Sequence, residues 1–115
     1  MNPVRKRIPN RRPQVTEPIS IGSNSFTASV GIDPDLMAPR ELFLEGAKAG
    51  SDMAHLLADI ATVMSIVLQH GLPASLFVGA VARIPETIDG PATKPATVLG
   101  AAIDLLARYE TQEAA

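Results

Sequence analysis

The hydrophobic period changes once along this chain, between Glu45 and Asp52, and this change constrains the fold more than any other feature. Before it, apolar and polar residues alternate, as in the run 25–32, which is typical of a strand with one buried face. After it, apolar residues recur every three or four positions, which is typical of an amphipathic helix. Strands followed by helices predict an α+β domain, and 115 residues leave room for one such domain.

The expected architecture is a small antiparallel three-stranded sheet followed by three helices packed on one face. The strands are expected at 18–22, 25–32 and 40–45, and their short connections predict a meander. The helices are expected at 51–70, 73–83 and 95–110. Residues 84–95 are rich in turn formers and predict a mobile loop that could act as a lid. The second face of the sheet is expected to be solvated or to form a homodimer, with a slight preference for the dimer.

The first helix has the strongest periodic signal. Its expected apolar stripe consists of Met53, Leu56, Leu57, Ile60, Val63, Met64 and Val67. Ser51 is the expected N-cap, and Gly71 suits the left-handed residue just past the helix end.

Residues 1–16 differ in composition from the rest and predict a basic, proline-rich, disordered arm. The arm contains five of the ten cations, and no acid precedes Glu17; these cations are Arg5, Lys6, Arg7, Arg11 and Arg12. If all five neutralised phosphates on duplex DNA, the log–log salt slope of binding would be about −4.5. The arm has no aromatic residue for base stacking, so such binding would be weak and sequence-blind. A solubilising tail or a clamp on an acidic partner is equally compatible. The expected organisation is this arm, a single domain over 17–110, and a frayed tail over 111–115.

The glycine-rich turn "EGAKAGSD" raises the question of a phosphate site. Unpaired N–H groups at a helix start attract anions, so Gly46, Lys48, Gly50 and Ser51 are candidate anion-binding residues. The Walker A pattern needs four residues between its glycines and Lys directly after the second, which this turn lacks. A plain turn with a capping serine is therefore the favoured interpretation.

Catalytic and metal-binding signals are weak. Asp52, His55 and Asp59 share one side of the first helix, but a solvated face explains them better than a metal site does. No nucleophile arrangement, cofactor motif or metal-ligand spacing stands out, so no catalytic residue, cofactor or metal is assigned. The chain has no cysteine, no apolar signal segment at its start and no run of about 20 apolar residues, which predicts a cytoplasmic protein.

Three segments, "RKRIPNRRP", "LFLEGAKAGSDMAHLLADIATVMSIVLQHGLP" and "PATVLGAAIDLLA", together resemble the TSCPD domain family. The resemblance covers residues 5–107. It implies a stand-alone relative of the C-terminal domain of adenosylcobalamin-dependent ribonucleotide reductases. The cysteines of the family pattern would align near Lys94–Val98 and Ala47–Lys48, where this chain has none, so any metal or redox role of those cysteines is not carried over.

The function that follows is a non-catalytic, accessory module of deoxyribonucleotide or DNA metabolism. Ribonucleotide reduction needs a thiyl radical and reducing cysteines, so a chain without cysteine cannot perform it alone. The expected partner is a reductase large subunit. The alternative is a small nucleic-acid-binding protein that acts through its basic arm.

Overall fold

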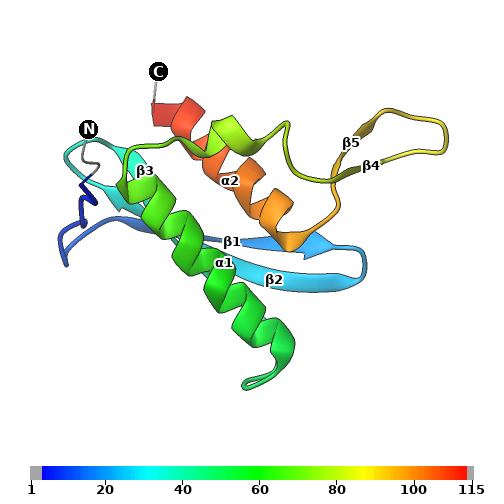
Figure 1. Cartoon of the computed structure of the whole chain (residues 1–115), viewed down its shortest axis with the longest axis horizontal. Helices are drawn as coiled ribbons and strands as arrows, with labels where there is room; N and C mark the ends of the chain where they lie inside the picture. The colour runs from blue at the N-terminus through cyan, green and yellow to red at the C-terminus, as the bar shows by residue number, and fades with distance from the viewer. Residues whose placement is uncertain (1–3, 114–115) are drawn as a thin grey trace.

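A computed structural model of the chain describes residues 4–113, with side chains described up to residue 110. Three strands lead the fold: β1 (Gln14–Ile21), β2 (Asn24–Asp33) and β3 (Ala38–Glu45). They form an antiparallel sheet in the order β1-β2-β3, so the predicted meander is confirmed (Figure 1). A two-residue turn joins β1 to β2, and Gly22 supplies the positive φ, 58°, that such a tight hairpin needs.

The two faces of the sheet differ in polarity, as alternation predicts. Phe26, Ala28 and Val30 are buried, as are Leu42 and Leu44 of β3. The opposite face carries small polar residues, and Thr16 and Ser29 share a hydrogen bond of 3.0 Å across it. β1 begins earlier than expected and includes Pro18; as an edge strand it tolerates a residue without an N–H group.

Helix α1 (Asp52–Gln69) begins and ends as the sequence predicts. Ser51 Oγ accepts the Ala54 N–H at 3.1 Å, so the predicted N-cap is confirmed. Gly71 has φ 89°, and the N–H groups of Gly71 and Leu72 bond to the carbonyls of Leu68 and Val67. This pair of bonds is a Schellman motif, which closes the helix with a left-handed residue.

The side of α1 that faces the core is narrower than the predicted stripe. Leu57, Ala61, Met64 and Leu68 are buried against the sheet and its neighbouring helix. Met53, Leu56 and Val63, expected in the same stripe, are 43%, 52% and 58% exposed. Seven apolar positions span more of the helix surface than one sheet can cover, and periodicity alone does not tell which edge of the stripe is buried.

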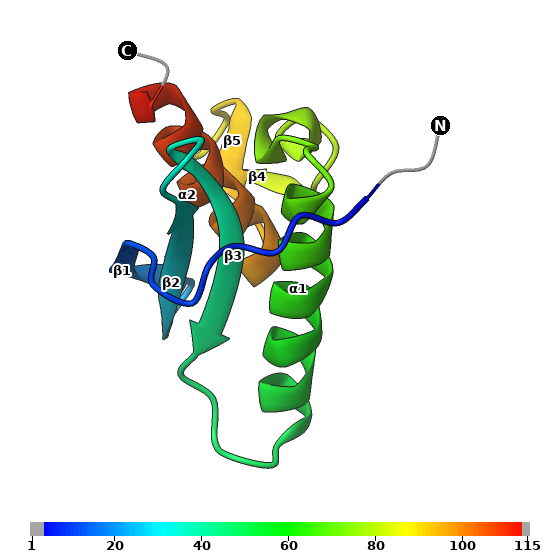
Figure 2. The ribbon, with the colours of Figure 1, turned by 90° about the vertical axis from the view of Figure 1, so that its left-hand side faces the viewer.

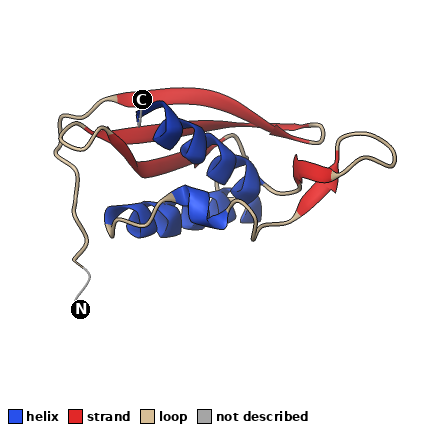
Figure 3. Cartoon of the chain, turned by 90° about the horizontal axis from the view of Figure 1, so that it is seen from above, coloured by secondary structure: helices blue, strands red, loops and turns tan. Residues whose placement is uncertain are grey.

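The expectation of three helices packed on one face is wrong. Residues 4–113 contain two α-helices, α1 and α2 (Val98–Glu113), which lie on the same side of the sheet (Figure 3). The predicted helix 73–83 is reduced to one 3₁₀ turn, η1 (Ala74–Phe77). Its first N–H groups, those of Ala74 and Ser75, bond to the Glu110 carboxylate of α2, and the chain turns again directly afterwards.

The prediction of a loop over residues 84–95 is also wrong, because this segment contributes to a second sheet. Strands β4 (Arg83–Pro85) and β5 (Ala92–Pro95) pair antiparallel as a hairpin that projects from the body (Figures 1 and 3). A turn closes its tip, with the Gly90 N–H bonded to Thr87 O at 3.0 Å and Asp89 at φ 66°. The Asp-Gly pair at 89–90 is a hairpin signal that the sequence interpretation passed over.

The buried core is aliphatic apart from Phe26. Helix α1 closes the open edge of β3. Ser65 Oγ accepts the Leu42 N–H at 2.9 Å and donates to Leu42 O at 3.2 Å, while Gln69 Nε2 donates to Arg40 O at 3.1 Å. Edge strands expose unpaired backbone groups that invite association with other strands. Two side chains of α1 satisfy these groups on β3 within the same chain.

We predict that Ser65→Ala destabilises the protein by about 1–3 kcal/mol, because it removes both side-chain hydrogen bonds of the Leu42 backbone. Denaturant unfolding measures the change. The matched control is Thr62→Ala, an exposed hydroxyl one turn away, which should change stability by less than about 0.5 kcal/mol. Equal effects of the two substitutions would contradict the edge-closing role of Ser65.

Candidate functional site

The glycine turn folds as a connection and a cap. Gly46 and Gly50 have φ 128° and 78°, and Ser51 Oγ also donates to Lys48 O at 2.6 Å. A Cβ on Gly46 would lie 3.0 Å from the Phe26 Cα, so the turn packs against β2. The hollow beside it, about 300 Å³, is lined by Glu45 and apolar residues and does not include Lys48. Anion binding by Gly46, Lys48, Gly50 and Ser51 stays a prediction.

The basic arm lies against the body and crosses the outside of β3 and the C-terminal end of α1 (Figure 2). The Lys6 N–H bonds to Gln69 O at 2.8 Å, and Lys6 Nζ lies 3.0 Å from Asp33 Oδ2. Asp33 is fully buried at the end of β2, and its Oδ1 accepts the Asp35 N–H at 2.9 Å. Within the described residues, Lys6 is the group that compensates Oδ2. The arm is therefore tied to a buried charge.

The charge state of Asp33 depends on these contacts. Burial alone would raise the pKa of the Asp33 carboxyl, because it penalises the charged form. The hydrogen bond from Lys6 and those from the Asp35 and Leu36 N–H groups outweigh burial, so the pKa lies below its usual value of 3.8. Asp33 is therefore an anion at neutral pH, and the arm supplies the cation, Lys6, that compensates its charge.

The other cations of the arm divide into two groups. Arg12 pairs with Glu41 through its Nε at 2.7 Å and its Nη2 at 2.6 Å, and Arg5 Nε donates to Gln69 Oε1 at 2.5 Å. Arg7 and Arg11 make no hydrogen bond or ion pair with the described residues. Three of the five predicted contact residues thus have roles within the chain.

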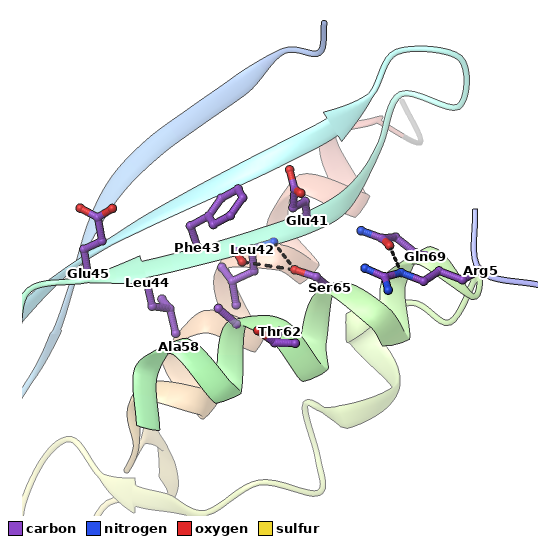
Figure 4. A pocket seen from close by; sticks show the side chains of 11 residues that line it. Arg5, Glu41, Leu42, Phe43, Leu44, Glu45, Ala58, Thr62, Ser65 and Gln69 are labelled. Carbon is purple, nitrogen blue, oxygen red and sulfur yellow. Dashed lines mark hydrogen bonds between the residues drawn. The ribbon is translucent and has the colours of Figure 1, made fainter. Parts of the chain in front are cut away.

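A polar hollow of about 310 Å³ lies between β3 and α1 (Figure 4). Arg5 and Gln69 close one end of it, Glu45 lies at the other, and Ser65 bonds to Leu42 between them. Of its polar groups, Arg5 bonds to Gln69, Ser65 bonds to the Leu42 backbone, and Glu41 pairs with Arg12 outside the hollow. This hollow joins the arm, the edge strand and the helix, and its arrangement is structural.

The β4–β5 hairpin is held at its base by one arginine. The Arg83 guanidinium forms a bidentate pair with Asp104 of α2, with both N···O distances 2.7 Å. It also donates to the carbonyls of Val78 and Thr93 at 3.0 and 3.1 Å. The hydrogen bond to Asp104 raises the pKa of Arg83 above its usual value, so its charge is fixed. Ile88, at the tip, is 95% exposed.

Among the side chains that the structure describes, residues 4–110, no group of three or more His, Cys, Asp or Glu could hold a metal ion. Asp52, His55 and Asp59 are exposed, as a solvated face requires. Tyr109 donates to Glu17, and this bond raises the pKa of the phenol. Both residues join α2 to β1.

Among the described residues, one helix, α1, is long and apolar enough to cross a membrane by length and composition. Core helices of other proteins have the same length and composition, and one side of α1 is part of the core. The cytoplasmic location stays a prediction.

These observations define a class: a two-layer α+β domain whose described polar clusters have structural roles and whose hairpin projects into solvent. The chain belongs to the TSCPD domain family, whose sequence pattern matches residues 3–109, and the resemblance inferred from the three segments is confirmed. No solved structure matches this chain.

The curated relatives are much longer proteins. Over 108 residues the chain is 29% identical to a vitamin B12-dependent ribonucleotide reductase of Rhodopirellula baltica, an alignment that covers 93% of this chain and 10% of that protein. The reductases of the same name from Streptantibioticus cattleyicolor and Streptomyces coelicolor are 33% identical over 76 residues, which is 66% of this chain and 12% or 8% of theirs. The chain therefore spans about a tenth of the length of the relatives it matches.

We predict that Lys6→Met destabilises the protein at pH 7 by about 1–3 kcal/mol, because it leaves the buried Asp33 carboxylate without its cation. The folded-state pKa of Asp33 is lowered, so this stability is fully present above its unfolded pKa, near 3.8, and is lost as pH falls through the folded value. The difference between wild type and Lys6→Met should therefore shrink below about pH 4. Urea unfolding at pH 7, 5 and 3 measures it.

Arg7→Met is the control, since Arg7 belongs to the same arm and has no described partner. It should change stability little at any pH. A Lys6→Met effect that is absent at pH 7, or constant down to pH 3, would contradict the ion-pair assignment.

Proposed function

We propose that this chain is a non-catalytic TSCPD module that binds the large subunit of a ribonucleotide reductase and serves deoxyribonucleotide metabolism through protein–protein contact. The family relation supports this, because the curated relatives that it matches are named as reductases and align over a small part of their length. The chain itself has no cysteine to form or reduce a thiyl radical.

The observation that carries the proposal is the hairpin. A two-stranded hairpin alone is marginally stable in water, yet this one projects from the domain and is fixed by Arg83. Ile84 and Ile88 on it are 45% and 95% exposed, and Glu86 and Asp89 lie between or beside them. An apolar side chain on a rigid support binds with a small entropy loss. A partner pocket with an apolar floor and a basic rim would fit this tip.

The arm supports nucleic-acid binding less than its composition suggests. Lys6, Arg5 and Arg12 have partners within the chain, which leaves Arg7 and Arg11 for phosphates. Two contacts at roughly 0.9 each lower the expected log–log salt slope from about −4.5 to about −1.8. Binding by the arm would then be weak, and it is the competing outcome of the experiment below.

We predict that the full chain binds the reductase large subunit encoded in the same genome, and that Ile88→Asp weakens binding at least tenfold, about 1.4 kcal/mol. Titration calorimetry at two salt concentrations measures the affinity. The matched control is Leu36→Asp. The Leu36 side chain has the same size as that of Ile88 and is 53% exposed, but it lies in the turn between β2 and β3.

Equal affinities of Ile88→Asp and wild type would remove the hairpin from the interface. Failure of wild type to bind the reductase would overturn the proposed partner. Binding that instead requires nucleic acid and depends on Arg7 and Arg11 would establish the arm as the functional element.

A further inference from the structure

The part of the arm between Lys6 and Pro13 is a loop that is attached to the body at both ends. At its start, Lys6 Nζ lies 3.0 Å from the buried Asp33 Oδ2. At its end, Pro13 O accepts the Ile32 N–H at 2.9 Å, where β1 begins to pair with β2. The loop crosses the outside of β3 between these two points (Figure 2). Residues 7–12, which we call the arginine loop, can therefore rearrange without detaching the arm from the domain.

The arginine loop carries three arginines that differ in their contacts. Arg7 and Arg11 are exposed and have no hydrogen bond or ion pair with the described residues. Arg12 is turned inward, with its Nε and Nη2 at 2.7 and 2.6 Å from Glu41 Oε1. Its Nη1 donates to two carbonyls of the loop itself at 3.2 and 3.3 Å. The loop thus offers two cations to solvent, while Glu41 occupies the third.

We propose that the arginine loop binds the phosphate backbone of a nucleic acid, and that Glu41 inhibits this binding by occupying Arg12. A carboxylate and a phosphate accept the same N–H groups of a guanidinium, so Arg12 contacts Glu41 or a phosphate, and not both. Arg11 and Arg12 are adjacent in the chain, and duplex DNA carries a negative charge about every 1.7 Å along its axis. Such closely spaced charges suit neighbouring cations. The loop has no aromatic residue for base stacking, so binding is independent of base sequence.

Arg12 is the cation that exchanges its partner, because water reaches its ion pair. The side chains of Arg12 and Glu41 are 23% and 18% exposed, so both charges are partly solvated when the pair separates. The Asp33 side chain has no exposed surface, and release of Lys6 would leave a buried carboxylate without a cation. Lys6 therefore stays docked and holds the loop at the sheet while Arg12 moves between Glu41 and a phosphate.

Removal of the inhibiting carboxylate should release Arg12 to DNA. Fluorescence anisotropy of a labelled DNA duplex, between about 50 and 200 mM salt, measures the affinity of the full chain. Wild type should bind with a log–log salt slope of about −1.8, from Arg7 and Arg11, and Glu41→Gln should steepen the slope to about −2.7. The matched control is Glu45→Gln, which removes the same charge from the same face of β3 at a residue with no ion pair to the described side chains. Its slope should equal that of wild type.

Arg12→Met separates the proposal from a general effect of charge. In the wild-type background it should leave the salt slope unchanged, because Glu41 already occupies Arg12. In the Glu41→Gln background it should return the slope to about −1.8. Circular dichroism and urea unfolding check that each variant is folded.

Equal slopes for Glu41→Gln and Glu45→Gln would overturn the proposal, as would a shallower slope for Arg12→Met in the wild-type background. Absence of DNA binding by Glu41→Gln would do the same. Binding of polyglutamate in place of DNA would assign the loop to an acidic protein partner and would also overturn it. The arginine loop is separate from the β4–β5 hairpin, so DNA binding and the proposed reductase binding can each fail while the other succeeds (Figure 1).

Discussion

The packing of α1 against β3 is the constraint on which the rest of the structure depends. β3 is an edge strand, so its inner side chains and its free backbone groups both need a neighbour, and α1 provides both. Leu57, Met64 and Leu68 bury the aliphatic core, while Ser65 and Gln69 bond to the backbone of Leu42 and Arg40. The same contact fixes the position of the C-terminal end of α1, where the arm attaches. Side chains of one helix thus set the sheet edge, the core and the course of the N-terminal segment.

The role of the cations in the arm depends on their partners in the fold. As a composition, residues 5–12 are a basic segment suited to phosphates. In the fold, Lys6 compensates Asp33, a carboxylate with no exposed surface, and Arg12 pairs with Glu41 on the outer side of the sheet. Burying an unpaired carboxylate is expensive, so the arm and the end of β2 stabilise one another. The described part of the arm is therefore tied to the sheet at Lys6 and Arg12.

The sequence predicted those parts of the fold that local pattern determines. Alternation gave the meander, and Ser51 and Gly71 gave the ends of α1, because each of these features depends on residues close together in the chain. The second expected helix, over 73–83, did not form because Ala74–Phe77 is held by Glu110, a contact 36 residues away that helix propensity does not contain. The hairpin depends on Arg83 meeting Asp104, and the Lys6–Asp33 pair depends on the arm crossing α1; both are tertiary events. The exposed apolar side chains were missed for the same reason. Whether an apolar residue is buried or exposed depends on tertiary packing, which the sequence pattern does not show.

The proposed binding role rests on how polar and apolar groups are distributed in the fold. Many of the charged and hydroxyl groups that come together serve the fold: Arg83 anchors the hairpin, Glu110 caps η1, and Tyr109 joins α2 to β1. The apolar surface that this domain leaves exposed lies on the hairpin tip and along α1. Apolar surface on rigid supports is suited to binding other proteins, because little conformational entropy is lost when it is covered.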